Sequence, residues 1–384
     1  MSTAVCGTIN LFVAGWTVKK IGPRAALIVQ TIFSALRIIP QVIGITIGGK
    51  FGMFVVQAAQ LINIIGGPYG YILIVNIIIS EVVSQEKRTV VFGKLQGAVM
   101  FGQGVGFIAG GTIGNKLGVR APFQVAFATF LFASAYVRFA VPFIPPELAS
   151  RGVNTSVTGK IGFFAPLKVF LPQLIYRANG TFVTHYGVSF LCAGIFLGVF
   201  ATAYVPFLAQ MYATAEFGFD QGENGWLMSE FSLLRGLFLV VAFPRIIKWG
   251  RLFLSRAEGQ KGGNILEHEI DSDAGYKAQS FDLVFLRWSL VVDGLLTAST
   301  ALATKKWHIY FVAALLPFGS GGAPAAKGII TNMCPASQRA DALNAVTLVE
   351  NIARLLSFGT FGLIYSSLAT LEKSYATFFC NAVS

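Results

Sequence analysis

Ten long apolar runs divide the chain, and short segments rich in Gly, Pro and basic residues separate them. Most of these runs are near the 20 or so residues that an α-helix needs to cross a bilayer. We expect membrane-spanning helices at residues 3–18, 25–47, 52–79, 91–113, 121–144, 182–207, 225–247, 281–303, 307–330 and 341–366. An eleventh apolar stretch begins near Tyr375. The pattern predicts an all-α membrane protein.

The composition excludes a soluble class. Hydrophobic residues make up 54% of the sequence and charged residues 12%, whereas soluble domains carry about 25% charged residues. So few charges do not cover a surface in water, and a bilayer is the solvent that fits. The net charge of +12 would point to nucleic acid in a soluble protein, but here the basic residues gather between the apolar runs. We therefore expect a lipid bilayer around the chain and no nucleic acid as a partner.

The basic residues between the runs and at their edges are unevenly distributed, with 17 in one set of alternate loops and 6 in the other. Cytoplasmic loops carry the excess of Lys and Arg. The long segments 145–181 and 251–280 are therefore predicted to be cytoplasmic, the second as a flexible polar loop. The apolar stretch 161–175 fits a segment that lies along the membrane surface. The glycosylation patterns at Asn154 and Asn179 lie on the cytoplasmic side, so neither is expected to be used.

Two short basic turns, at 15–24 and 244–251, resemble each other, and each surrounds a Gly at the cytoplasmic end of a run. Two similar halves joined by a long cytoplasmic segment are typical of transporters that bind a solute between the halves. We predict an N-terminal half bundle at 1–144, a central loop at 145–181 and a C-terminal half bundle at 182–384.

The first of these turns resembles the loop signature of the major facilitator superfamily, G-x-x-x-D-R/K-x-G-R/K-R/K. The matching residues are Gly15, Lys20, Gly22 and Arg24. The acidic position of the signature reads Lys19, so its charge is reversed. In the family that carboxylate contacts a neighbouring helix and helps to latch one conformation. Because of this reversal, the resemblance does not predict the same latch in this chain.

The run at 91–113 is similar to the antiporter motif on the fifth helix of the same family, G-x8-G-x3-G-P-x2-G-G. The proline position reads Phe107, and the motif glycines are all present, at Gly93, Gly102, Gly106, Gly110 and Gly111. Residues four apart share one helix face, so Gly102, Gly106 and Gly110 form a stripe that favours close approach and bending. A packing stripe without a role in transport is the alternative.

The resemblance extends over the whole chain, whose ten runs correspond to family helices 2–11. The tail from Tyr375 resembles the start of helix 12, so helix 1 and most of helix 12 are expected to be missing. The connection at 81–93, with Glu86, Lys87 and Arg88, is also similar to that of drug and solute transporters. The arginine that many proton antiporters carry on helix 4 is not evident, so the resemblance does not predict proton antiport.

Helices 1, 4, 7 and 10 line the central cavity in the family, which directs attention to polar groups on the run at 52–79. Gln57, Gln60 and Asn63 are three residues apart and share one helix face. Their amides are candidates for binding hydroxyl groups or a carboxylate of a solute. Hydrogen bonding between helices is the alternative.

Glycines interrupt the two runs that correspond to family helices 4 and 10. The interruptions are Gly66 and Gly67, followed by Pro68, in one run and the glycines at 319–322 in the other. Bent backbone in a membrane leaves polar groups that a ligand is able to satisfy, so we interpret both breaks as pointers to a binding site. Packing features are the alternative.

Ionisable side chains inside the runs are costly and mark function by default. The candidates for coupling to a proton or a solute are Glu350, Arg354, Asp293 and Glu230. The alternative for Glu350 and Arg354, four residues apart, is an ion pair along one helix face, and for Asp293 it is a structural partner. Arg37 lies in the middle of its run and is less easily explained. Snorkelling explains the charges nearer the cytoplasmic ends, at Arg138, Arg287 and Lys327.

The four cysteines and three histidines show no metal-ligand spacing, and no paired carboxylates or nucleophile constellation stands out. The sequence therefore predicts no metal site, no cofactor and no enzymatic activity. The favoured interpretation is a secondary transporter that moves a small organic solute or drug by alternating access, with proton coupling left open. The alternative is a truncated, non-transporting membrane protein, or an incomplete gene model, that acts at most as an interaction partner.

Overall fold

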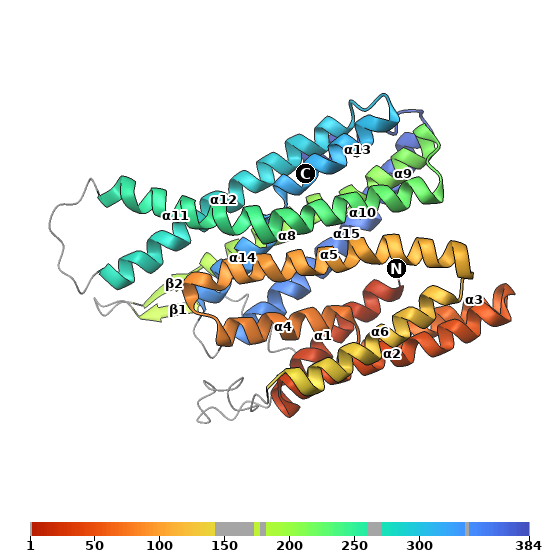
Figure 1. Ribbon diagram of the computed structural model, residues 1–384. Helices are drawn as coiled ribbons and strands as arrows, with labels where there is room; N and C mark the ends of the chain where they lie inside the picture. The colour runs from red at the N-terminus through yellow and green to blue at the C-terminus, as the bar shows by residue number, and fades with distance from the viewer. Residues whose placement is uncertain (1, 143–172, 177–181, 260–269, 335–337, 384) are drawn as a thin grey trace. The chain divides into compact units, whose positions relative to one another are not determined.

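The computed structural model describes residues 2–142, 173–176, 182–259, 270–334 and 338–383. Most of these residues are helical, and one short β-hairpin is the only other regular structure among the described residues (Figure 1). The expected all-α membrane fold is confirmed, because each of the predicted apolar runs falls largely on a helix or on a helix interrupted by a short break.

The helices of the first third of the chain follow one another through tight turns. Gly22 has a φ of +84°, a conformation that favours glycine, and Pro23 starts the next helix with its fixed φ, so the chain reverses sharply there. The bounds are α1 (Ser2–Ile21), α2 (Pro23–Ile47), α3 (Gly49–Ala58), the 3-10 helix η1 (Ala59–Ile64), α4 (Pro68–Val82), α5 (Gln85–Leu117) and α6 (Ala121–Ala140).

The helices of the remaining chain are interrupted more often. The bounds are α8 (Gly187–Thr202), α9 (Val205–Phe217), α10 (Gln221–Leu237), the π-helical turn η3 (Phe238–Ala242), α11 (Phe243–Gly259), α12 (Ile270–Thr300), α13 (Lys306–Leu315), the 3-10 turn η4 (Leu316–Gly319), α14 (Gly322–Met333), α15 (Arg339–Ala369) and α16 (Ala376–Val383). A capping box fixes the start of α10, because Asp220 and Glu223 each accept the other's backbone N–H, at 2.6 and 3.1 Å.

The hairpin replaces the start of a predicted helix. Its strands β1 (Gln173–Tyr176) and β2 (Phe182–His185) pair antiparallel, with Gln173 opposite His185. The run predicted at 182–207 therefore begins as a strand, and it is broken again between α8 and α9.

The segments predicted as cytoplasmic loops are described only in part. The segment at 251–280 was expected to be a flexible loop, but it is helical at 251–259 and at 270–280, and residues between these lie outside the described part. The stretch at 161–175 is described only at its end, within β1. The patterns at Asn154 and Asn179 lie outside the described residues.

Seven described helical segments are long and apolar enough to cross a membrane. They are Pro23–Ile47, Gly49–Val82, Ala121–Ala140, Gly187–Phe217, Gly222–Phe253, Lys306–Met333 and Arg339–Ala369. The predicted spans at 3–18, 91–113 and 281–303 lie on α1, α5 and α12, which fall outside this set.

The chain divides into two compact units. Unit 1 comprises Met1–Val82, Ala109–Ala193 and Met333–Leu355, and unit 2 comprises Val83–Ile108, Gly194–Asn332 and Leu356–Ser384. These boundaries differ from those of the expected half bundles, since most of α5 belongs to unit 2 and the first part of α15 belongs to unit 1. The division of the chain into an N-terminal and a C-terminal half bundle stays a prediction.

Close helix pairs and buried polar groups hold unit 1 together. In Figure 1, α2 lies alongside α6, and α1 also packs on α4. The Ser134 hydroxyl of α6 donates to Thr31 Oγ1 of α2 at 2.8 Å, in a buried position. Between α2 and α3, a Cβ atom placed on Gly52 would lie 2.2 Å from the Gly44 carbonyl oxygen, so these glycines allow the backbones to touch. In a bilayer, small residues and hydrogen bonds of this kind associate helices.

Aromatic packing forms the core of unit 2. Tyr204 at the start of α9 stacks on Phe361 of α15, with ring centroids 6.1 Å apart. Tyr212 of α9 meets Phe378 of α16 edge to face at 5.2 Å. Both phenylalanines are almost fully buried, at 2% and 0% exposed. Contacts of these geometries fix α9, α15 and α16 against one another.

Candidate functional site

The break between η1 and α4 is closed by two buried amides from neighbouring helices. The Gly67 N–H donates to Gln30 Oε1 at 2.8 Å, and the Gly70 N–H donates to Asn10 Oδ1 at 2.8 Å. Asn10 also donates to Gln30 Oε1 at 3.1 Å and to the Ile64 carbonyl at 3.2 Å. Asn10 and Gln30 are fully buried. These backbone N–H groups, which were expected to meet a ligand, are therefore bonded to side chains of unit 1 instead.

The three amides predicted to bind a solute lie on successive turns of α3 and η1 and differ in burial. Gln57 is exposed, Gln60 is half-buried and Asn63 is 2% exposed. Asn63 Nδ2 donates to Gln60 Oε1 at 3.0 Å, and Arg37 Nη1 of α2 donates to the same oxygen at 3.5 Å. Asn63 Oδ1 and Arg37 Nε are buried without a hydrogen-bond partner among the described residues. The structure thus adds Arg37 to the predicted set and leaves one donor and one acceptor open.

Asp293 of α12 packs against the second helix break. A Cβ atom on Gly319 would lie 2.7 Å from Asp293 Cβ and 2.8 Å from its Oδ1, so the contact requires glycine. Gly322, at the start of α14, faces Ser289 one turn earlier on α12. This coupling candidate therefore lies directly at the break between α13 and α14.

The reversed charge in the first basic turn meets an acidic residue on another helix of unit 1. Lys19 Nζ of α1 lies 2.6 Å from Asp341 Oδ1 of α15, and the two side chains are 24% and 23% exposed. One turn earlier, a Cβ atom on Gly15 would lie 2.4 Å from Asn344 Nδ2. The two helices therefore approach closely along this line. We call the contact between Lys19 and Asp341 the exchanged pair.

The other residues of this turn have local roles. Lys20 Nζ lies 4.8 Å from the centre of the Trp16 ring, a cation–π distance. Gly22 supplies the positive φ that precedes α2. The Arg24 guanidinium donates to the carbonyl of Arg138, at the end of α6. The matched positions of the signature thus shape the turn from α1 to α2 and its contact with α6.

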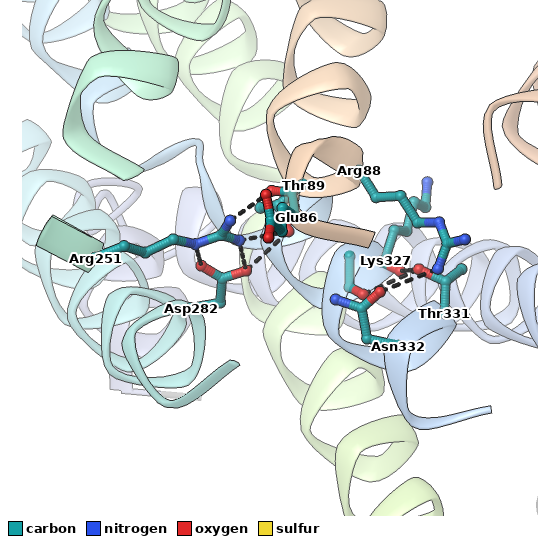
Figure 2. Close-up of polar contacts among 9 residues, drawn as sticks. Glu86, Arg88, Thr89, Arg251, Asp282, Lys327, Thr331 and Asn332 are labelled. Carbon is teal, nitrogen blue, oxygen red and sulfur yellow. Dashed lines mark hydrogen bonds and ion pairs between the residues drawn. The ribbon is translucent and has the colours of Figure 1, made fainter. Parts of the chain in front are cut away.

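The second basic turn ends in a buried ion pair in unit 2. Figure 2 shows Arg251 of α11 pointing toward Asp282 of α12 and toward the first turns of α5. Arg251 Nε and Nη2 donate to the two carboxylate oxygens of Asp282, at 3.1 and 2.6 Å. The Thr89 hydroxyl donates to Asp282 at 2.8 Å, and Arg251 Nη1 donates to the Glu86 carbonyl at 2.6 Å. This cluster, which we call the Arg251 cluster, joins α5, α11 and α12.

Two further cations are buried beside this cluster, on α5 and α14. Arg88 is 5% exposed and Lys327 is 7% exposed. Arg88 donates to Asn332 Oδ1 at 3.2 Å and to the Val83 carbonyl at 3.1 Å (Figure 2). A Cβ atom on Gly328 would lie 2.1 Å from Thr89 Oγ1, so α14 touches α5 there. The burial of Lys327 contradicts the expectation that it snorkels to water.

The glycines of the antiporter-like motif on α5 have two different surroundings. A Cβ atom on Gly93 would lie 2.4 Å from Phe243 Cδ1, so this position is tightly packed. Among the described residues, no atom lies within 4 Å of a Cβ atom on the later motif glycines, which are Gly102, Gly106, Gly110 and Gly111. No described helix therefore approaches the stripe closely at these positions, and its role stays a prediction.

Other glycines of α5 make the close approach that the motif predicted. A Cβ atom on Gly97 would lie 2.6 Å from Val240 Cγ2, within the π-helical turn η3. A Cβ atom on Gly104 would lie 2.7 Å from Leu233 Cγ, and the Gly104 carbonyl accepts the Ser229 hydroxyl at 2.7 Å. Together with Gly93 these glycines occupy one side of α5, because spacings of four and seven residues return to the same helix face.

The other coupling candidates lie at separate places. Glu350 of α15 is 8% exposed, whereas Arg354 one turn later is half-buried. Glu230 of α10 is half-buried. Glu350 and Arg354 belong to unit 1, whereas Glu230 belongs to unit 2.

The metal-ligating and thiol side chains do not gather in one place within the described part of the chain. No group of three or more His, Cys, Asp or Glu side chains there is placed to hold a metal ion. The four cysteines are free thiols, and Cys6, Cys192 and Cys334 are buried. Burial raises the pKa of the Cys334 thiol to about 11, so this thiol is protonated at neutral pH.

Sequence reasoning did not single out four residues that organise these sites, Asn10, Gln30, Asp282 and Asp341. A usable signal exists for the first two, because an amide inside an apolar run must find a partner in the membrane. The acidic residues carry a weaker signal, which is their position close to the start of an apolar run. Their partners are 31 residues away for Asp282 and 322 residues away for Asp341.

No protein-family model matches the sequence, and no curated protein matches it. The chain is nevertheless similar to solved structures. The human organic anion transporter MFSD10 (TETRAN) gives a TM-score of 0.71 at 13% identity, over 99% of this chain and 80% of that chain. The major facilitator superfamily proton:xylose symporter XylE gives 0.63 at 13% identity, over 100% and 82%. A bacterial homologue of the iron transporter ferroportin, in an outward-facing state, gives 0.62 at 14% identity, over 99% and 87%.

At this level of identity the likeness concerns the fold alone, and it extends over at least 99% of this chain. The seven apolar helical segments agree with it. The protein is therefore an integral, multi-pass membrane protein.

Proposed function

We propose that this chain, which has the fold of the major facilitator superfamily, is a secondary transporter that moves a small organic solute by alternating access. The observation that carries the proposal is the likeness of its fold to solved transporters over nearly the whole chain. Those transporters are named for organic anions, for xylose with protons and for iron. The fold therefore supports transport over the non-transporting alternative. It does not identify the solute, which has to be inferred from the side chains.

Two contacts support a mechanism with discrete conformations. The exchanged pair joins α1 to α15 in unit 1, and the Arg251 cluster joins α5, α11 and α12 in unit 2. Each contact involves a basic residue from one of the two similar turns, at a helix end that the charge distribution predicts to be cytoplasmic. Polar contacts that are made in one state and broken in another are a common basis of switching between conformations. In this proposal the half bundles at 1–144 and 182–384 are the moving parts, and 145–181 connects them.

The predicted solute and coupling residues keep their roles within this proposal. Gln57, Gln60 and Asn63 are proposed to contact the solute, and the open Oδ1 of Asn63 supports this. Coupling to a proton or to the solute is proposed for the four candidates inside the predicted spans, Glu350, Arg354, Asp293 and Glu230, with a carboxylate as the group that takes up any proton. Asp293 is the best placed, because it touches the helix break at Gly319. Protonation of its carboxylate there would change the electrostatic force on the backbone of the break.

The direct test is solute exchange in vesicles that contain the purified protein. We expect saturable counterflow of at least one labelled solute from a panel of sugars, organic carboxylates and cationic drugs. Protein-free vesicles, and vesicles without a solute gradient, are the controls. If correctly inserted protein exchanges nothing from the panel, the non-transporting alternative becomes the better description.

A further inference from the structure

Arg37 places a permanent positive charge deep in the membrane. It lies in α2, which runs from Pro23 to Ile47 and qualifies as a membrane span. At a rise of about 1.5 Å per residue, its Cα is roughly 15 Å from the nearer end of the helix. That depth is too great for an arginine side chain to bring its head group to water. A guanidinium at this depth needs an anionic or strongly polar partner.

The helices that surround Arg37 offer no such partner. In unit 1, α2 packs on α1, α3, η1, α4 and α6. The first acidic residue of the whole chain is Glu81, at the end of α4, and α6 contains none. Glu81 is 21 residues beyond Gln60, which corresponds to roughly 30 Å along a helix. No described acidic side chain forms an ion pair with Arg37.

The neutral groups around Arg37 satisfy it only in part. A guanidinium carries five N–H donors. The contact of Arg37 Nη1 with Gln60 Oε1 is long, at 3.5 Å, and that oxygen already accepts from Asn63 at 3.0 Å. Arg37 Nε remains buried without an acceptor, and Asn63 Oδ1, on a side chain that is 2% exposed, remains without a donor. The site therefore lacks an anion to pair with Arg37. In addition, Asn63 Oδ1 is open to accept a hydrogen bond from one hydroxyl or amine group.

We propose that Arg37, with Gln60 and Asn63 beside it, binds the carboxylate of a small organic acid, which is the solute class of the transporter proposed above. A carboxylate matches the planar fork of a guanidinium with two parallel hydrogen bonds. One guanidinium neutralises one charge, so a monovalent carboxylate fits this site better than a divalent phosphate. A lipid head group does not fit, because lipid phosphates lie at the membrane surface and Arg37 lies near mid-membrane.

Thermal unfolding of the purified protein in mild detergent tests the site without requiring transport. The probes are benzoate, its uncharged analogue benzamide, lactate and inorganic phosphate. We expect benzoate or lactate to raise the unfolding temperature by about 2 °C or more. Benzamide and phosphate should leave it unchanged. A shift by benzamide equal to that by benzoate, a larger shift by phosphate, or no shift by either carboxylate would overturn the proposal.

Two variants at Arg37 and one matched control test whether Arg37 is the residue that binds the carboxylate. Arg37→Gln should remove the carboxylate shift and leave the ligand-free protein at least as stable as the wild type, because an uncompensated charge has been removed. Arg37→Lys keeps the charge but loses the fork, so the apparent Kd should rise about tenfold. Arg138→Gln removes an exposed arginine from α6, which also packs on α2, and should keep the full shift. A carboxylate shift that persists in Arg37→Gln would refute the assignment.

Binding and transport are separable outcomes. Carboxylate binding that depends on Arg37, without any exchange in vesicles, would keep this inference and remove the proposed function. Exchange of an uncharged solute that is indifferent to Arg37→Gln would keep the proposed function and remove this inference.

Discussion

The glycines of α5 differ in whether their surroundings leave space for an added methyl group. At Gly93 the space for a Cβ atom is occupied by the ring of Phe243, whereas at Gly106 no described atom lies within 4 Å. Both residues belong to the same motif, so spacing alone gives them equal weight. The packed position contributes to the stability of unit 2, and the open position is free to serve a different purpose, such as bending of the helix.

Alanine substitution separates these two roles. Gly93→Ala should lower the free energy of unfolding by about 1–3 kcal/mol, because the new methyl group overlaps the ring of Phe243 at 2.4 Å. Gly106→Ala should leave the unfolding temperature unchanged or raise it slightly, because helical alanine costs less entropy than glycine. Thermal unfolding of both variants in the same detergent is the measurement. Equal destabilisation by the two substitutions would contradict the packing described for α5.

The larger variant Gly106→Leu tests the bending role itself. We expect normal expression and folding, because open space surrounds the position, together with loss of solute exchange in vesicles. Unchanged exchange would rule out a hinge at Gly106.

At the scale of elements, a break in a membrane helix is stable only when other elements satisfy its backbone. The break at Gly67 depends on Gln30 of α2, which accepts the Gly67 N–H, and on Asn10 of α1, which donates to the Ile64 carbonyl. Three helices are thereby joined through one buried network. Loss of one amide affects all three.

The amide of Gln30 should be essential for the stability of unit 1. Gln30→Leu keeps the approximate volume but leaves the Gly67 N–H and Asn10 Nδ2 without this acceptor. A buried unsatisfied group costs about 1–3 kcal/mol, so the variant should unfold at a clearly lower temperature. Gln41→Leu is the matched control, since Gln41 is a buried amide on the same helix that makes no hydrogen bond among the described residues. Similar losses in both variants would argue against the network.

The exchanged pair predicts a rescue by reversal. Lys19→Asp should place two carboxylates together, and Asp341→Lys two cations, so each single variant should lose solute exchange and about 1 kcal/mol or less of stability. The double variant restores opposite charges and should recover most of both. The pair of Lys306 with Glu223 is more exposed, at 49% and 34%, so Lys306→Gln, which removes this pair and keeps the capping box of Glu223, should have little effect. Failure of the double variant to recover would mean that the pair acts through more than its charges.

At the scale of the whole molecule, the sequence predicts elements better than contacts. The apolar runs place the helices because the bilayer fixes their length, and the glycines at 66–67 and 319–322 correctly mark helix breaks. Spacing does not say which neighbour a face meets, so the open stripe at Gly102 and the bonded backbone at Gly67 were not foreseen. The partner of Lys19 is 322 residues away, and no local pattern specifies a contact at that separation.

The orientation of the chain in the membrane is testable with one helix. Lys87 and Lys116 are exposed lysines near the two ends of α5. The distribution of basic residues predicts that Lys87 is cytoplasmic and Lys116 is on the opposite side. In a cysteine-free background, a membrane-impermeant maleimide should therefore label Lys116→Cys in intact cells and Lys87→Cys only after permeabilisation. The reverse pattern would invert the predicted topology.

The π-helical turn at Phe238–Ala242 lies within the long helix that runs from α10 to α11. Such a turn holds one residue more than an α-helical turn. Deletion of a single codon in this turn would allow a regular α-helix to form, so local geometry would improve. The residues after the turn would keep nearly the same position around the axis, because the longer π-turn and the shorter α-turn each complete about one revolution, so Arg251 would still face Asp282. The deletion would instead change the turn itself, where Val240 lies against Gly97 of α5, so the extra residue shapes one local contact without redirecting the rest of the helix.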